Sequence, residues 1–87
     1  TGRREEALAE TAALIREAGA GEALPAAADM GDAAAVEAIA ARIERELGRC
    51  DILVNSAGIN VPKRSWKEVE VAGIDAVIAA DLAGPFY

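Results

Sequence analysis

Apolar residues recur at helical spacing in three stretches of the chain, which predicts three amphipathic helices. The first spans residues 4–18, and Gly19 supplies its stop signal. The second begins at Asp32, a residue type suited to capping a helix N-terminus, and ends at Gly48. The third begins near residue 71. The apolar positions of the three helices are Leu8, Ala12, Ile15 and Ala18; Val36, Ile39, Ala40, Ile43 and Leu47; and Ile74, Val77, Ile78, Leu82 and Pro85.

Two short segments between these helices are predicted to be strands. Residues 23–28 predict a weak strand, and because Pro25 cannot donate a ladder hydrogen bond, this strand belongs at a sheet edge. The strand predicted over residues 51–54 is continuously apolar after Asp51, as in strands that helices cover on both faces. The order helix, strand, helix, strand, helix implies right-handed crossovers between parallel strands. The sequence therefore predicts part of a doubly wound α/β fold with a parallel sheet.

Composition and charge exclude several classes of function. The chain has 9 Lys and Arg against 15 Asp and Glu, a net charge of -6, and lacks the basic stripe expected of a nucleic-acid-binding protein. No apolar run reaches the roughly 18 residues of a membrane span. The single cysteine, Cys50, cannot form an internal disulfide and is expected to be a buried, inert thiol, and with no histidine no metal site is expected. These features favour a protein of the reducing cytoplasm.

Both ends of the chain look like interior positions of a longer sequence. The sequence begins at Thr1 and not at a methionine. Residues 84–87 (GPFY) end it inside an apolar stretch with two aromatic residues. Domain termini usually lie in exposed, polar segments. We therefore expect residues 1–87 to be an internal segment of a single domain. A complete small acidic protein is the alternative.

Three short segments fall where parallel α/β sheets bind ligands, at the carboxyl ends of strands. They are residues 1–4 (TGRR), 29–30 (DM) and 55–58 (NSAG). Arg3 offers a planar donor fork suited to phosphate, Asp29 offers a carboxylate acceptor, and the small residues of 55–58 let the backbone approach a ligand closely. The alternatives are solvated arginines at a helix start, an aspartate that caps a loop or helix, and an ordinary strand-to-loop turn.

Together these segments resemble the short-chain dehydrogenase/reductase family of NAD(P)-dependent oxidoreductases. The family pattern Asp-x-Leu-Val-Asn-Asn-Ala-Gly appears as DILVNSAG over residues 51–58, with Ser56 in place of the second Asn. The Asp-Val or Asp-Met pair after the third strand appears at residues 29–30, and the family's Asn-Leu-x-Gly-x-Phe appears as DLAGPF over residues 81–86. The likeness runs through all 87 residues and implies part of an NAD(P)-binding Rossmann domain.

The resemblance implies a cofactor site built from Gly2, Arg3, Arg4, Asp29, Met30, Asn55, Ser56, Ala57 and Gly58. NAD-preferring relatives carry a carboxylate near the position of Gly2, so its absence here favours the 2′-phosphate of NADP(H), with NAD(H) as the alternative. By resemblance, Asp29 accepts a hydrogen bond from the adenine amino group and Met30 supplies a backbone contact. Asn55 is suited to bridge neighbouring strands through its amide.

Asp81 stands where the family has a catalytic Asn that holds a water in a proton relay to a lysine. It falls in α-helical register with Ile74, Val77 and Ile78, so its carboxylate is predicted to lie on the apolar stripe of the third helix. A buried charge needs a partner or a raised pKa. Catalytic participation and a purely structural pairing both remain open.

The function implied by the resemblance is hydride transfer between NADP(H) and a carbonyl or secondary alcohol. A 3-oxoacyl-(acyl-carrier-protein) reductase and a sugar or alcohol dehydrogenase are the two subclasses, each as a homo-oligomeric dimer or tetramer. The glycine-rich pyrophosphate turn is expected before Thr1, and the catalytic Ser and Tyr-x-x-x-Lys after Tyr87. The alternative is a non-catalytic nucleotide-binding or scaffold protein of the same fold, in which Asp81 marks the loss of the relay.

Overall fold

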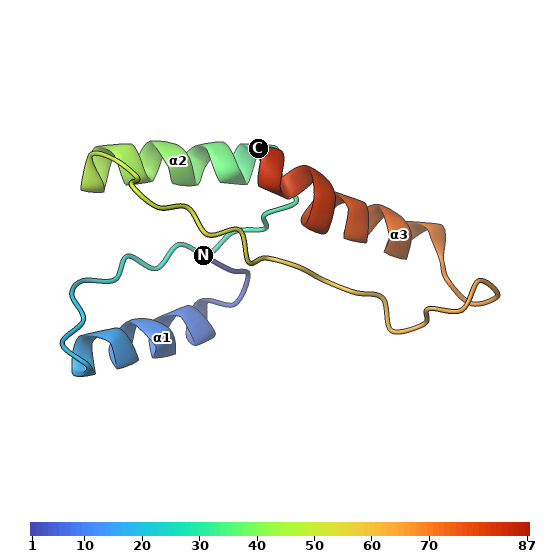
Figure 1. Ribbon diagram of the computed structural model, residues 1–87, viewed down its shortest axis with the longest axis horizontal. Helices are drawn as coiled ribbons and strands as arrows, with labels where there is room; N and C mark the ends of the chain where they lie inside the picture. The colour runs from blue at the N-terminus through green and yellow to red at the C-terminus, as the bar shows by residue number, and fades with distance from the viewer.

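The computed structural model describes all of residues 1–87 and contains three α-helices. They are α1 (Glu5–Glu17), α2 (Ala33–Leu47) and α3 (Val71–Val77), and α3 continues into a π-helical turn, η1 (Ile78–Ala83), and a 3₁₀ turn, η2 (Gly84–Phe86). In Figure 1, α2 and the continuous α3–η1–η2 helix follow one another along one side of the molecule, and α1 lies across the connecting segments from α2. The molecule is elongated, with extents of 49 × 26 × 19 Å.

The first two helices begin and end close to the predicted residues, because their signals are local. The helix predicted over residues 4–18 is confirmed as α1, one residue shorter at each end. Asp32 caps α2 as predicted: its Oδ1 accepts hydrogen bonds from the backbone N–H groups of Ala34 at 3.0 Å and Ala35 at 3.4 Å. Gly48 ends α2 with a φ of 82°, in the left-handed region that favours glycine.

The third helix begins at Val71, as predicted, but changes geometry after Val77. Residues 78–83 form the π turn η1, and Gly84 and Pro85 then tighten the chain into the 3₁₀ turn η2. Because π-helical hydrogen bonds span five residues instead of four, side chains beyond Ile78 do not keep the α-helical register assumed from the sequence. Such π segments are rare and occur frequently at functional sites.

The two predicted strands are not formed as strands in this structure. The only strand-like pairing is an isolated parallel bridge between Gly2 and Ala27, supported by a hydrogen bond from the Ala28 N–H to the Gly2 carbonyl at 3.0 Å. In a doubly wound sheet of order 3-2-1-4-5-6, the third strand lies beside the second, and the fourth lies between the first and the fifth. In such a sheet, residues 51–54 as a fourth strand would pair with segments other than 23–28. In this structure they pair with none, whereas Ala27 pairs with Gly2.

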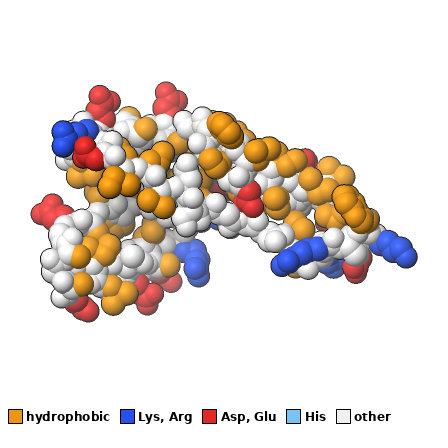
Figure 2. All heavy atoms as spheres, viewed as in Figure 1, with side chains coloured by type: hydrophobic (Ala, Val, Ile, Leu, Met, Phe, Trp, Pro, Cys, Tyr) orange, Lys and Arg blue, Asp and Glu red, His pale blue; other side chains and the backbone are white.

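The core that these elements form is very small. Only Ala12 and Ala26 are buried, whereas the apolar run of Ile52, Leu53 and Val54 is 76–83% exposed. Hydrophobic side chains are accordingly visible over much of the face in Figure 2. The prediction of a buried Cys50 is wrong for this structure, because the thiol is exposed beside the unpaired segment. No helix combines the length and the apolar composition needed to cross a membrane.

Candidate functional site

A cavity of about 610 Å³ lies where four parts of the chain meet: the N-terminal segment, the turn before α2, the segment after residue 53, and the third helix. Its volume is in the range typical of small-molecule and cofactor sites. Most of the predicted cofactor-binding residues line it, namely Gly2, Arg3, Asp29, Met30, Ser56, Ala57 and Gly58. Arg4 and Asn55 do not. The structure thus brings together residues that lie as far as 56 positions apart in the sequence.

The Gly2–Ala27 bridge positions one end of this cavity. It sets the first residues of the chain beside the turn before α2, so that Arg3 and Asp29 line the same space. The Thr1 hydroxyl lies 3.8 Å from the Met30 sulfur across the same junction. Arg3 is exposed, which leaves its guanidinium available to a ligand.

Arg4 departs from the predicted cofactor site. It is the N-cap residue of α1, makes no side-chain capping hydrogen bond, and does not line the cavity. A residue at an N-cap has extended backbone, here with φ -101° and ψ 104°, and this conformation turns the chain from the bridge at Gly2 into the helix. The alternative of a solvated arginine at the helix start therefore describes Arg4 in this structure.

Asp29 makes a tight turn before α2. Its Oδ1 accepts a hydrogen bond from the Gly31 N–H at 2.9 Å, and its carbonyl accepts one from the Asp32 N–H at 3.1 Å. This is the local side-chain turn that aspartate favours, and it matches the loop-capping alternative. The other carboxylate oxygen, Oδ2, makes none of these hydrogen bonds, so one side chain can hold the turn and still accept a donor from a ligand.

The segment after residue 54 supplies a wall made of small side chains. Ser56, Ala57 and Gly58 line the cavity, so a ligand can approach their backbone closely. Asn55 instead lines a neighbouring groove of about 530 Å³ between α2 and residues 50–57. Its side chain is exposed and does not bridge two strands, because no ladder forms here.

Asp81 lies on η1 at the edge of this wall. Its Oδ1 accepts a hydrogen bond from the backbone N–H of Ile59 at 2.8 Å. The prediction that the carboxylate is buried on an apolar stripe is wrong here, since Asp81 is exposed and the π turn shifts the register. The contact with Ile59 gives the carboxylate a structural partner.

The third helix contributes residues that were not expected at the site. Ala76, Ala79 and Ala80 line the cavity, and their small side chains let the turn before α2 approach closely. A Cβ atom at Gly31 would lie 3.4 Å from Ala79, and one at Gly84 would lie 2.5 Å from the Met30 carbonyl oxygen. A stripe of small residues at helical spacing was the available signal in the sequence, but it is equally typical of any close helix contact.

The donor set of the cavity fits part of an organic cofactor. The arginine can bind a phosphate group, and the free carboxylate oxygen can accept a hydrogen bond from an amine. Exposed backbone beside small residues can contact the edge of a ring. An adenine nucleotide carries all three of these groups. The structure contains no group of three or more side chains arranged to hold a metal ion.

Comparison with known proteins gives a consistent result. The whole chain, residues 1–87, matches the family model described as short chain dehydrogenase. D-threitol dehydrogenase of Mycolicibacterium smegmatis is 42% identical over 60 residues, which cover 69% of this chain and 23% of that protein. The short chain dehydrogenase/reductase dpmpG of Macrophomina phaseolina is 37% identical over 82 residues, covering 94% and 47%. The 2,3-dihydro-2,3-dihydroxybenzoate dehydrogenase of Bacillus subtilis is 58% identical over 41 residues, covering 47% and 15%. The chain spans less than half the length of each of these relatives.

Proposed function

Because the chain belongs to the short-chain dehydrogenase family, a family of Rossmann-type α/β folds that use NAD(P), we propose that it forms the adenosine-binding part of an NADP(H)-dependent oxidoreductase. The observation that carries this proposal is that Arg3, Asp29 and residues 56–58 line one cavity of about 610 Å³. By family resemblance, these positions are expected to contact the cofactor. Residues 1–87 are, in this proposal, an internal segment of one Rossmann domain.

The preference for NADP(H) rests on the N-terminal side of the cavity. Gly2 carries no carboxylate that would repel a 2′-phosphate, and the exposed guanidinium of Arg3 can donate two parallel hydrogen bonds to it. Binding of NAD(H) through the same cavity is weaker in this proposal but not abolished.

Asp29 and residues 56–58 hold the adenine and the adjoining ribose. The Asp29 Oδ2 would accept a hydrogen bond from the adenine amino group while Oδ1 keeps the turn to Gly31. The Met30 backbone supplies a further contact to the ring, and the small residues 56–58 allow the cofactor to lie against the backbone. When bound, the nicotinamide cofactor supplies or accepts the hydride that reduces a carbonyl or oxidises a secondary alcohol.

Asp81 supports the reaction from the edge of the cavity. Its carboxylate fixes the turn after Gly58 through the Ile59 N–H and can hold a water with its remaining lone pairs. A carboxylate in place of the family's amide adds a negative charge near the proton relay. This charge raises the pKa of neighbouring acid groups and so alters the pH dependence of proton transfer.

The substrate in this proposal is a small carbonyl or secondary alcohol, of the 3-oxoacyl-carrier or polyol type. General oxidoreduction is supported by the names of relatives, which include a threitol and a 2-dehydro-3-deoxy-D-gluconate dehydrogenase. We further propose a homo-oligomer of two or four subunits in the cytoplasm. A single free cysteine is in keeping with a reducing compartment.

Nucleotide titration of the full-length protein tests this function. Isothermal calorimetry with NADPH and NADH should give a lower Kd for NADPH, and NADPH oxidation should follow addition of a suitable ketone or aldehyde. Absence of binding by either nucleotide would exclude the proposal. Binding without turnover across a panel of carbonyl compounds would favour the non-catalytic alternative, in which Asp81 marks the loss of the relay.

A further inference from the structure

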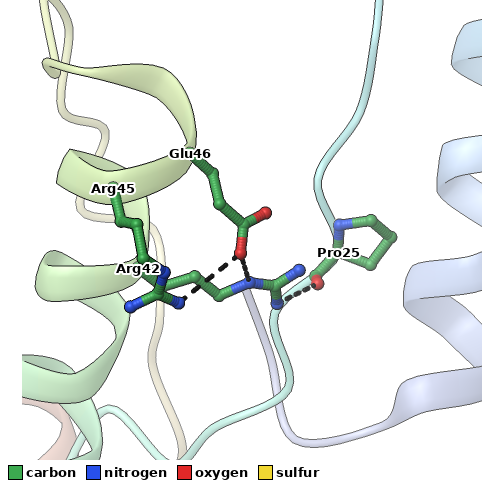
Figure 3. A network of polar contacts seen from close by, with 4 residues as sticks. All are labelled: Pro25, Arg42, Arg45 and Glu46. Carbon is green, nitrogen blue, oxygen red and sulfur yellow. Dashed lines mark hydrogen bonds and ion pairs between the residues drawn. The ribbon is translucent and has the colours of Figure 1, made fainter.

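One side chain of α2 reaches across to the segment that leads into the cavity. Arg42 donates a hydrogen bond from Nη1 to the Pro25 carbonyl oxygen at 3.0 Å and a second from Nε to the Glu46 Oε1 at 2.8 Å. Figure 3 shows the Arg42 guanidinium between the Glu46 carboxylate of its own helix and the Pro25 carbonyl of the neighbouring segment. Arg45 approaches the same Glu46 oxygen only at 3.7 Å.

The Pro25 carbonyl is an informative point of attachment, because little else holds the segment around it. Residues 23–28 form no strand, and their one pairing is the bridge to Gly2. Proline itself cannot donate a backbone hydrogen bond. The bond from Arg42 at Pro25 and the bond from the Ala28 N–H to the Gly2 carbonyl therefore fix the two ends of a short stretch that contains the buried Ala26.

This short stretch connects the two sides of the cavity. Ala28 lines the cavity next to Asp29, and its N–H bond to Gly2 sets the distance between the Arg3 side and the Asp29 side. A shift of the backbone at Pro25 would strain this bond and, through it, the position of Asp29 relative to Arg3. Neither Arg42 nor Glu46 lines the cavity, so any effect they have on a ligand is transmitted through this backbone.

We propose that Arg42, held in place by Glu46, is a positioning residue for the nucleotide site and aligns the Asp29 turn with Arg3. This inference rests on the proposed binding of NADP(H). Because Arg42 does not line the cavity, it sets the affinity for the adenosine half of the cofactor and leaves the chemical step unchanged. Arg45 has the same charge on the same helix but makes no bond to Pro25.

The ionisation of Glu46 fits this arrangement. The hydrogen bond from Arg42 is the main cause that holds the pKa of the Glu46 carboxyl below its ordinary value, and the positive charges of Arg42 and Arg45 act in the same direction. At neutral pH the carboxylate is therefore charged. A hydrogen bond to a charged acceptor holds the planar guanidinium of Arg42 in one orientation. Arg42 then loses less conformational freedom when it bonds to the Pro25 carbonyl.

The test uses the full-length protein and two probes, NADPH and adenosine 2′,5′-bisphosphate, which lacks the nicotinamide half. Arg42→Ala should raise the Kd of both probes by the same factor, about three- to tenfold, with kcat at saturating NADPH unchanged. Arg45→Ala, the matched control, should bind both probes as the wild type does. Glu46→Ala should raise the Kd less than Arg42→Ala, and Arg42→Lys should restore part of the affinity, since the lysine ammonium can still donate to the Pro25 carbonyl.

Several results would overturn the inference. One is an Arg42→Ala protein that binds both probes with wild-type affinity, and another is an Arg45→Ala protein that loses as much affinity as Arg42→Ala. A lower kcat at unchanged KM would indicate a loss of folded protein instead of a displaced site. If Arg42→Ala does not fold, Glu46→Ala takes its place, and wild-type affinity of Glu46→Ala for both probes decides against the inference. A wild-type protein that binds neither probe would remove the proposed function itself, and this inference with it.

Discussion

The Asp81 carboxylate accepts a hydrogen bond from the backbone N–H of Ile59 at 2.8 Å, and this bond joins η1 to the turn that follows the small-residue wall of the cavity. The two residues are 22 positions apart in the sequence. A Cβ atom at Gly58 would lie 3.7 Å from the same carboxylate, an ordinary contact distance. Asp81 therefore acts on the shape of the site through the backbone as well as through its charge.

Replacing Asp81 separates these two effects. Asp81→Asn keeps an oxygen that accepts the Ile59 N–H and removes the charge, whereas Asp81→Ala removes both. In the full-length protein we expect Asp81→Ala to lower kcat by about tenfold or more. A group that itself transfers the proton contributes roughly 10²–10⁴-fold, and Asp81 acts only through a water. Asp81→Asn should retain most of kcat and shift its pH profile, because a nearby negative charge is lost. Steady-state turnover of the two variants between pH 5 and 9 measures kcat and its pH dependence. Unchanged turnover of Asp81→Ala across this range would remove Asp81 from the mechanism.

The helices could be predicted from the sequence because their signals are local. The Asp32 cap and the Gly48 stop act within one helical turn of their own positions, so no distant partner is needed to recognise them. The position of Asp81 was predicted wrongly for a related reason. An α-helical register was assumed through residue 81, whereas the chain changes to a π turn after Val77. In this turn Ala79 lies close to the segment before α2, a contact that the local sequence does not reveal.

The strands and the polar contacts between distant segments could not be predicted in the same way. A strand exists only with a neighbour, and residues 51–54 have no ladder partner among residues 1–87. The bond between Arg42 and Pro25 links residues 17 positions apart and follows no periodic pattern. Seven of the nine residues predicted to bind the cofactor line one cavity, and Arg4 and Asn55 lie outside it. This grouping was expected because the ends of parallel strands meet at one edge of a sheet. Their role in binding stays a prediction.

Arg3 should control the choice between the two nicotinamide cofactors. Arg3→Glu replaces a phosphate donor with a carboxylate that repels the 2′-phosphate, so we expect the Kd for NADPH to rise about tenfold or more, with a much smaller change for NADH. Arg4→Glu is the matched control, since Arg4 is adjacent in sequence but does not line the cavity. Calorimetric titration of both variants with both nucleotides measures the ratio of the Kd for NADPH to the Kd for NADH. Equal losses for NADPH and NADH in Arg3→Glu would show that Arg3 does not recognise the 2′-phosphate.

Gly84 should be intolerant of a larger side chain. A Cβ at this position would lie 2.5 Å from the Met30 carbonyl oxygen, so Gly84→Ala must displace either η2 or the turn before α2. Overpacking of this kind typically costs about 1–3 kcal/mol of unfolding free energy. Gly2→Ala is the control, because its Cβ would meet only the Leu8 side chain, at 3.7 Å. Denaturant unfolding of the full-length protein compares the two. A Gly84→Ala protein as stable as the wild type would contradict this close approach.

Glu46 should contribute to stability in a pH-dependent way. Its folded-state pKa lies below the ordinary value of 4.5, mainly because Arg42 donates a hydrogen bond to the carboxylate. A lowered folded pKa means that the unfolded chain takes up the proton more readily, so the contribution is fully present above pH 4.5 and is lost as the pH falls through the folded pKa. The Tm of the wild type should therefore exceed that of Glu46→Gln at pH 7, and the difference should shrink steadily below pH 4.5.

Glu44→Gln removes the same charge from the same helix without removing a hydrogen bond from Arg42, and it serves as the control. Thermal unfolding of the three proteins at several pH values measures this difference, which should be small because Glu46 is exposed. If the Tm difference between the wild type and Glu46→Gln instead grows toward low pH, the pH dependence has the opposite sign to the one expected. That result would show that the ion pair between Glu46 and Arg42 does not form in solution.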